Sequence, residues 1–108
     1  MKLSLPIFIA ALAFSATAPA LAETSGAALF AERCGMCHRT NGMGVGILAR
    51  RPGDSSKGLL ENRSDLTVAL VTTVTRIGIG NMPRIPRGEV SDPEMKAIAE
   101  YLAKGKQQ

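Results

Sequence analysis

The stretch Cys34-Gly35-Met36-Cys37-His38 decides which fold is expected of this chain. It has the pattern C-x-x-C-H, which is typical of covalent attachment of a c-type haem. Two thiols separated by two residues can each add to one vinyl group of the ring, and a histidine that follows directly can place its imidazole beneath the iron. The motif therefore predicts that Cys34 and Cys37 bind haem c through thioether bonds and that His38 is the proximal iron ligand.

Other uses of two nearby cysteines fit the sequence less well. A structural zinc site needs four ligands, and the chain contains only two Cys and one His. A thioredoxin-like redox pair would need a βαβ context, which the glycine-rich flanks of the motif do not provide. A disulfide across a two-residue gap remains the plain alternative, although so short a loop removes little chain entropy.

The second axial ligand of the iron must come from another residue type, because His38 is the only histidine. Met82 is the candidate, since Pro83 restricts it to an extended backbone and Pro86 stiffens the same segment. The weaker rivals lie inside the motif, shortly after His38, or at helical spacing on an apolar face: Met36, Met43 and Met95.

The first 22 residues have the pattern of a cleavable signal peptide. Lys2 provides the positive start, residues 7–14 are apolar, and Ala20-Leu21-Ala22 forms a small-residue cleavage site. The apolar run is too short to span a bilayer. We expect export to the periplasm and a single domain at residues 23–108, with no integral membrane segment in the mature chain.

The predicted mature domain is poor in large side chains for its core. Phe30 and Tyr101 are its only aromatic residues, and there is no Trp. A chain this short commonly needs a disulfide, a metal or a cofactor at its centre. Two segments rich in Gly and Pro, roughly residues 39–63 and 77–90, are predicted to be irregular loops that wrap such a guest.

Three segments have helical patterns, which predicts an all-α fold. The first begins near Ser25, and the second begins at Ser64-Asp65, where a β-branched run leaves a strand as the rival interpretation. The third has Asp92 as its cap and Pro93 at its first position. Its apolar residues repeat at helical spacing, and its end is marked by a cation and a glycine: Met95, Ile98, Ala99, Leu102, Lys104 and Gly105.

Through these residues the chain resembles the small class I c-type cytochromes over residues 23–108. Gly26 and Phe30 match the first helix of that family, residues 98–102 match its last helix, and Met82-Pro83 matches its axial methionine motif. The resemblance implies the small cytochrome c fold, three main helices and long loops around one covalent haem. At Ile47 the family usually has a proline whose carbonyl accepts a hydrogen bond from the proximal histidine. We therefore expect a less rigid loop around His38.

A narrower resemblance is to the cytochrome subunits of flavoproteins that oxidise 4-alkylphenols, such as para-cresol methylhydroxylase and eugenol hydroxylase. Residues 44–46, 82–86 and 99–102, together with Val90 and Asp92, carry this likeness. It implies a flavoprotein partner subunit that oxidises the phenol and passes single electrons to the haem.

The predicted function is electron transfer, and the chain by itself is not expected to be an enzyme. A downstream acceptor such as another cytochrome or a copper protein is expected, and nucleic acid is not. Two alternatives stay open: a freely diffusing shuttle for another dehydrogenase or oxidase, and a small haem sensor or enzyme with an open iron site. Four arginines are expected to form either a basic docking face for a protein partner or ordinary solvated surface: Arg50, Arg51, Arg84 and Arg87.

Overall fold

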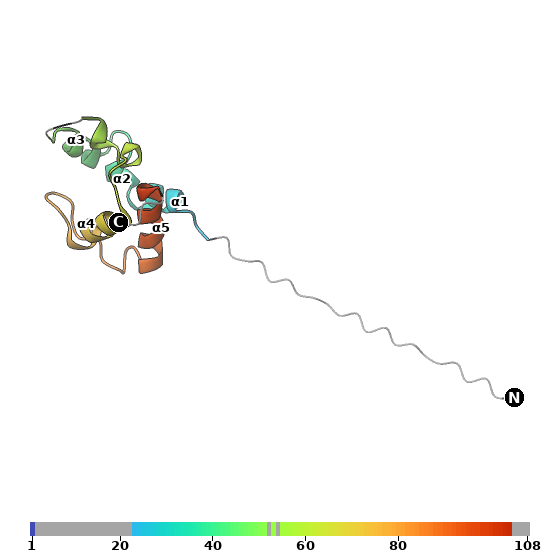
Figure 1. Ribbon diagram of the computed structural model, residues 1–108. Coiled ribbons are helices and arrows are strands. Elements are labelled where there is room, and N and C mark those ends of the chain that lie inside the picture. The colour runs from blue at the N-terminus through green and yellow to red at the C-terminus, as the bar shows by residue number, and fades with distance from the viewer. Residues whose placement is uncertain (2–22, 52, 54, 105–108) are drawn as a thin grey trace.

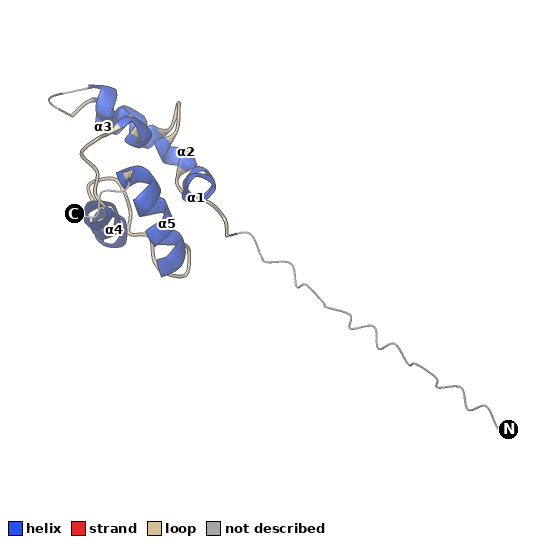
Figure 2. Ribbon diagram, turned by 45° about the vertical axis from the view of Figure 1, so that its right-hand side comes forward, coloured by secondary structure: helices blue, strands red, loops and turns tan. Residues whose placement is uncertain are grey.

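The computed structural model describes residues 1, 23–51, 53 and 55–104, and it is helical (Figures 1 and 2). The α-helices are α1 (Gly26–Arg33), α2 (Gly35–His38), α3 (Met43–Ala49), α4 (Val68–Ile77) and α5 (Asp92–Ala103). Two 3₁₀ helices, Ser55–Gly58 and Leu60–Asn62, lie between α3 and α4. Within the described residues no helix is long and apolar enough to cross a membrane. The predicted all-α class is confirmed, whereas the predicted signal peptide lies, apart from Met1, outside the described residues.

Each of the three longest helices begins at a side-chain cap. The hydroxyl of Ser25 accepts a hydrogen bond from the Ala28 amide at the start of α1, as predicted. Helix α4 begins later than predicted, at Val68, because Thr67 caps it by accepting from the amide of Leu70. The β-branched run is therefore helical, and its strand alternative is wrong.

The cap of α5 lies one residue before the predicted one. Ser91 and Glu94 form a capping box, in which the Glu94 carboxylate accepts from the Ser91 amide at 2.8 Å. Asp92, the predicted cap, is instead the first helical residue and pairs with arginines outside the helix. The helix ends at Lys104, which takes the left-handed conformation (φ 51°) predicted for Gly105; Gly105 lies outside the described residues.

Helices α1 and α5 cross closely, as Figure 1 shows, and Gly26 makes this crossing possible. A Cβ atom at Gly26 would lie 2.2 Å from the carbonyl oxygen of Ala97. The rings of Phe30 and Tyr101 pack across the same crossing with centroids 5.9 Å apart. The core consists of buried side chains from both helices and from the segments that precede α4 and α5: Leu29, Phe30, Leu66, Val90, Met95, Ile98 and Leu102.

The segment 39–63 is more regular than predicted, because it contains α3 and the two 3₁₀ helices. Glycine normally weakens a helix, which is why Gly44 and Gly46 favoured a loop in the sequence. In the structure Gly44 is packed so closely against Cys37 and His38 that a side chain there would collide. Tertiary contact, rather than helix propensity, explains this element.

Candidate haem site

The motif residues lie at the junction of α1 and α2. Cys34 ends α1, and its amide donates to the carbonyl of Phe30 at 2.9 Å. The amide of His38 in turn donates to the carbonyl of Cys34 at 3.0 Å, so the histidine follows the first cysteine by one helical turn. The two cysteines are not joined to each other. The backbone thus presents both thiols and the imidazole from one short, hydrogen-bonded segment.

A cavity of about 290 Å³ opens beside this segment. Its volume is close to the lower end of the range of small-molecule and cofactor sites, about 300–1,000 Å³. The structure brings all four residues predicted to bind haem to the wall of this one cavity: Cys34, Cys37, His38 and Met82. The rest of the wall is mainly apolar and includes Phe30, Ile47, Leu48, Leu60, Leu66, Leu70, Val71, Val74, Ile79, Pro83, Met95, Ile98 and Leu102.

One ring nitrogen of His38 is buried beside α3. This nitrogen, Nδ1, has no hydrogen-bond partner among the described residues. A Cβ atom at Gly44 would lie 3.2 Å from Nδ1, so this edge of the ring faces α3. Burial lowers the pKa of His38, which favours the neutral imidazole that a metal ion requires.

Ile47 does not provide the carbonyl contact that the family proline would make. The residue lies within α3 rather than in a loop. Nδ1 of His38 makes no hydrogen bond with the Ile47 carbonyl or with any other described group. The segment around Ile47 is therefore a helix rather than the expected loop, and Nδ1 of His38 has no hydrogen-bond acceptor among the described residues.

Cys34 is less exposed to solvent than Cys37. Burial, followed by the nearby charge of Cys37, raises the pKa of Cys34 above its ordinary value. The side chain of Cys37 is exposed. Both thiols border the cavity, as attachment of a ring at two points requires.

Met82 lies in a turn that follows α4. Ile79 and Met82 exchange backbone hydrogen bonds of 3.0 and 2.9 Å around a two-residue turn. Gly78 and Gly80 take positive φ angles of 76° and 55°, which glycine adopts without strain. The predicted irregularity of this segment thus holds apart from that single bridge.

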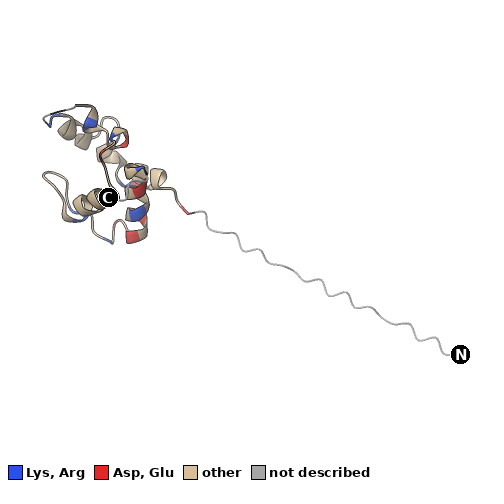
Figure 3. Cartoon of the chain, in the orientation of Figure 1, with Lys and Arg blue, Asp and Glu red and all other residues tan. Residues whose placement is uncertain are grey.

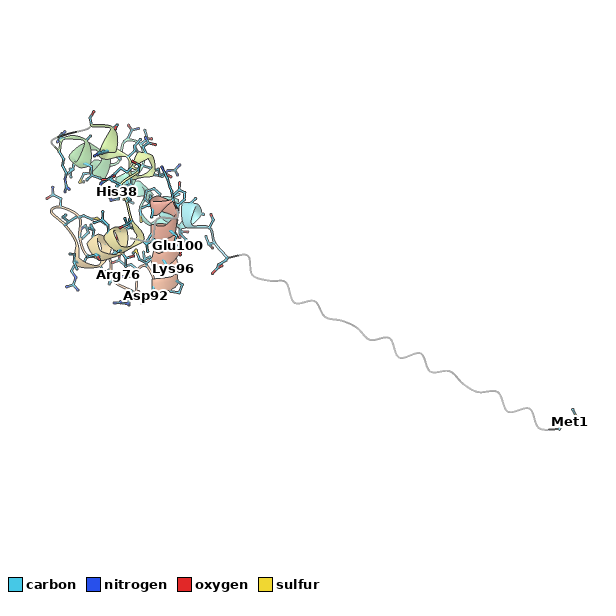
Figure 4. All side chains as sticks on the ribbon, viewed as in Figure 1. Met1, His38, Arg76, Asp92, Lys96 and Glu100 are labelled. Atoms are coloured by element: carbon cyan, nitrogen blue, oxygen red, sulfur yellow. The ribbon has the colours of Figure 1, made fainter. Side chains whose placement is uncertain are left out.

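The methionines belong to different elements of the fold. Met43 is the first residue of α3, the helix that packs against α2 and its terminal residue His38. Met82 belongs to the segment after α4, and α4 packs against α5. Figure 4 shows His38, the last residue of α2, across from α4. Met36 is 91% exposed and does not line the cavity, and Met95 is buried in the core of α5, as expected.

Two arginines, Arg51 and Arg63, are the cationic side chains on the cavity wall. Arg63 makes a two-point ion pair with Asp65 at 2.9 and 2.7 Å. This hydrogen-bonded pair lowers the pKa of Asp65 to about 2. A carboxylate on a bound ring would find its positive partners here. Arg63 was not singled out in the sequence, although its two-residue spacing from Asp65 is a local signal that could have indicated the pair.

The charges elsewhere do not form a single-sign surface. Acidic and basic residues alternate along α5 (Figure 3), where Lys96 and Glu100 pair at 2.6 Å. Arg87 pairs with Asp92 at 2.8 Å, whereas Arg84 makes no ion pair with any described residue.

The fold and this site together define a c-type cytochrome domain. A donor set of two thiols, an imidazole with a buried, unpartnered Nδ1 and a thioether around an apolar cavity fits covalent haem. The family model described as "Cytochrome C oxidase, cbb3-type, subunit III" matches residues 21–102, and the chain belongs to this family of cytochrome c domains. The cofactor of such a domain is haem c.

The structure is similar to the cytochrome subunit of p-cresol methylhydroxylase. In the crystal structure of that protein with substrate bound, the match has 33% sequence identity and a TM-score of 0.53, and it covers 73% of this chain and 89% of the other. In a second crystal structure of p-cresol methylhydroxylase the identity is 30% and the TM-score 0.51, over 73% and 90% of the two chains. No curated protein sequence matches the chain significantly.

Proposed function

We propose that this chain is a single-haem electron carrier whose haem c is bound through Cys34 and Cys37 and ligated by His38 and Met82. The observation that carries the proposal is the meeting of these four side chains on one cavity, with the imidazole at the end of α2 and the thioether in the turn after α4. Covalent haem supplies a one-electron change between ferric and ferrous iron when it is bound there.

The remaining residues of the site favour transfer of electrons over chemistry on a substrate. The apolar wall excludes water, and a histidine–methionine ligand pair in such surroundings raises the reduction potential. With two axial residues in place, no position is left for a substrate. Arg51 and Arg63 would hold the carboxylates of the ring at the polar part of the wall.

The optical spectrum of the purified holoprotein tests the ligand assignment. We expect six-coordinate low-spin iron in both oxidation states, and a mass equal to the chain cut after Ala22 plus one haem. A five-coordinate ferrous spectrum that changes readily on exposure to carbon monoxide would instead identify a haem sensor or enzyme. A mass that includes residues 1–22 would contradict cleavage and the proposed periplasmic location.

The proposed electron donor is a flavoprotein subunit that oxidises a 4-alkylphenol. Similarity to the cytochrome subunit of p-cresol methylhydroxylase, at 30–33% identity over most of both chains, supports this partner. Electrons would enter at the cavity mouth, where Ile79 is 46% exposed and Met43 is 71% exposed. They would leave to another small redox protein, such as a cytochrome or a copper protein.

Gel filtration with the flavoprotein at low salt and at about 0.5 M salt tests the partner. The higher concentration shortens the electrostatic screening length to about 4 Å and weakens steering by charges such as Arg84. A permanent subunit with an apolar contact face should co-elute under both conditions. Co-elution only at low salt would contradict the subunit and indicate a diffusing shuttle.

A further inference from the structure

Arg76, in the last turn of α4, is a partly buried cation that reaches across to the segment that follows Met82. Its side chain is 14% exposed. Nη1 donates to two backbone carbonyls, that of Ile85 at 3.0 Å and that of Val90 at 2.9 Å. Nη2 donates to a carboxylate oxygen of Asp92 at 2.9 Å. Figure 4 shows Arg76 and Asp92 together at the same end of α4 and α5.

The two carbonyls belong to a segment that is tied to α4 at a second point. The amide of Ile85 donates to the carbonyl of Thr75 at 2.9 Å, so both backbone groups of Ile85 are bound to consecutive residues of one helix. On the other side of Met82, the bridge to Ile79 closes the turn. Met82 therefore lies between two fixed points, with only two residues separating it from Ile85.

The guanidinium of Arg76 is largely withdrawn from water, so its hydrogen-bond partners must replace the water that it loses. Its Nε is buried without a partner among the described residues, and an unsatisfied buried donor destabilises the fold. Only a planar fork with several donors can bind the carbonyls of Ile85 and Val90 and a carboxylate together. A lysine at this position would have the charge but not the geometry. The contacts of Arg76 go to the segment 85–92, which joins the methionine turn to α5.

We propose that Arg76 is a positioning residue for the iron ligand: its guanidinium holds the Ile85–Val90 segment against α4 and so keeps the thioether of Met82 directed at the cavity. The inference rests on the proposed ligation by Met82. It adds that the strength of this ligation depends on a side chain that does not line the cavity.

The test is the affinity of the ferric holoprotein for imidazole, which competes with methionine for the iron. Wild type must first show the methionine–iron charge-transfer band, and its absence would overturn the proposed ligation rather than the role of Arg76. With the band present, Arg76→Gln should weaken it and raise the imidazole affinity at least about tenfold, the change expected if even one of the three charge-assisted hydrogen bonds of Arg76 is lost. Arg76→Lys should give an intermediate value, because it retains the charge alone.

Arg87→Gln is the matched control, because Arg87 pairs with the same carboxylate at 2.8 Å but is 72% exposed and bonds to no loop carbonyl. It should bind imidazole as wild type does. Unchanged affinity in Arg76→Gln, or an equal rise in Arg87→Gln, would overturn the proposal. If Arg76→Gln does not fold, amide hydrogen exchange in Arg76→Lys decides: the Ile85 amide, which is bound to the Thr75 carbonyl, should exchange faster than in wild type, and unchanged protection would overturn the tether.

Discussion

The imidazole of His38 lies against the bare α-carbon of Gly44. A methyl group at Gly44 would lie 3.1 Å from Cε1 of the ring and 2.8 Å from the carbonyl oxygen of Cys37. Neither neighbour can easily move, since one is backbone and the other is the proposed iron ligand. We expect Gly44→Ala to destabilise the holoprotein by about 1–3 kcal/mol, as overpacking does, measured by guanidinium unfolding.

Gly46→Ala, in the same helix, is the control for that experiment. A Cβ atom at Gly46 would meet nothing within 4 Å. Alanine is the better helix former, so this change should stabilise the protein by about 0.5–1 kcal/mol. Equal effects of the two substitutions would show that Gly44 does not limit the approach of α3 to His38.

The crossing of α1 and α5 provides a second steric prediction. Gly26→Ala should force the helices apart, because the new methyl group would overlap the Ala97 carbonyl. We expect a loss near the upper end of the range for overpacked sites, about 3 kcal/mol. Gly88→Ala, which has open space around it, should change the free energy of unfolding by less than about 0.5 kcal/mol. A wild-type unfolding curve for Gly26→Ala would contradict the close crossing.

The choice between methionines is tested by two single substitutions. Met82→Ala should lower the reduction potential and allow carbon monoxide to bind ferrous iron, because the distal thioether is lost. Met43→Ala should do neither, since Met43 lies in α3, which packs against α2 and its terminal residue His38. Redox titration and carbon monoxide difference spectra measure both properties. The reverse pattern would transfer the distal role to Met43.

Removal of either cysteine of the motif should affect folding as well as covalent haem attachment. Cys34→Ala or Cys37→Ala should yield little covalent haem, and the haem-free chain should be largely unfolded because the core then lacks its central filler. Circular dichroism on the purified apo chain measures this. A cooperative thermal transition with full helicity in the haem-free chain is the result that would refute it.

The hydroxyl of Tyr101 predicts a pH dependence at alkaline pH. It donates to the carboxylate of Glu61, and this hydrogen bond, followed by burial, raises the pKa of Tyr101 above its ordinary value of about 10. Because the pKa is higher in the folded state, the stabilisation is complete below about pH 10 and is lost as the pH rises through the folded value.

Tyr101 is the only tyrosine, so NMR of carbon-13-labelled tyrosine follows its titration directly. Glu61→Gln should bring the pKa of Tyr101 back toward about 10, since the charged acceptor is gone. A wild-type titration at or below pH 10 would contradict the hydrogen bond.

The sequence predicted the features that depend on residues close together in the chain, namely the C-x-x-C-H motif and helix α5. The C-x-x-C-H motif places its own three residues by its spacing, and Pro93 with the apolar repeat was enough to predict α5. The cap of α5 was off by one residue because Ser91 and Asp92 are both good caps. Asp92 bonds instead to Arg76, sixteen residues earlier. Helix propensity alone cannot anticipate such a contact.

Contacts between distant segments explain the remaining differences. Helix α3 was not predicted, since two glycines in seven residues count against a helix until Gly44 is seen against Cys37. The role of Arg76 was also invisible, because its partners Ile85 and Val90 offer only backbone carbonyls. Every residue type has such a carbonyl, so the sequence does not mark these two positions.

The crossing of α1 with α5 has a consequence for the order of events during synthesis. Phe30 and Gly26 find their partners on Tyr101 and Ala97, which the ribosome adds much later than Cys34 and Cys37. Until that last helix is made, α1 has nothing to bury its apolar face against, and a helix of this length is unstable alone. Until α5 is available, no closed fold can therefore form around the two thiols, and they stay accessible in the incomplete chain.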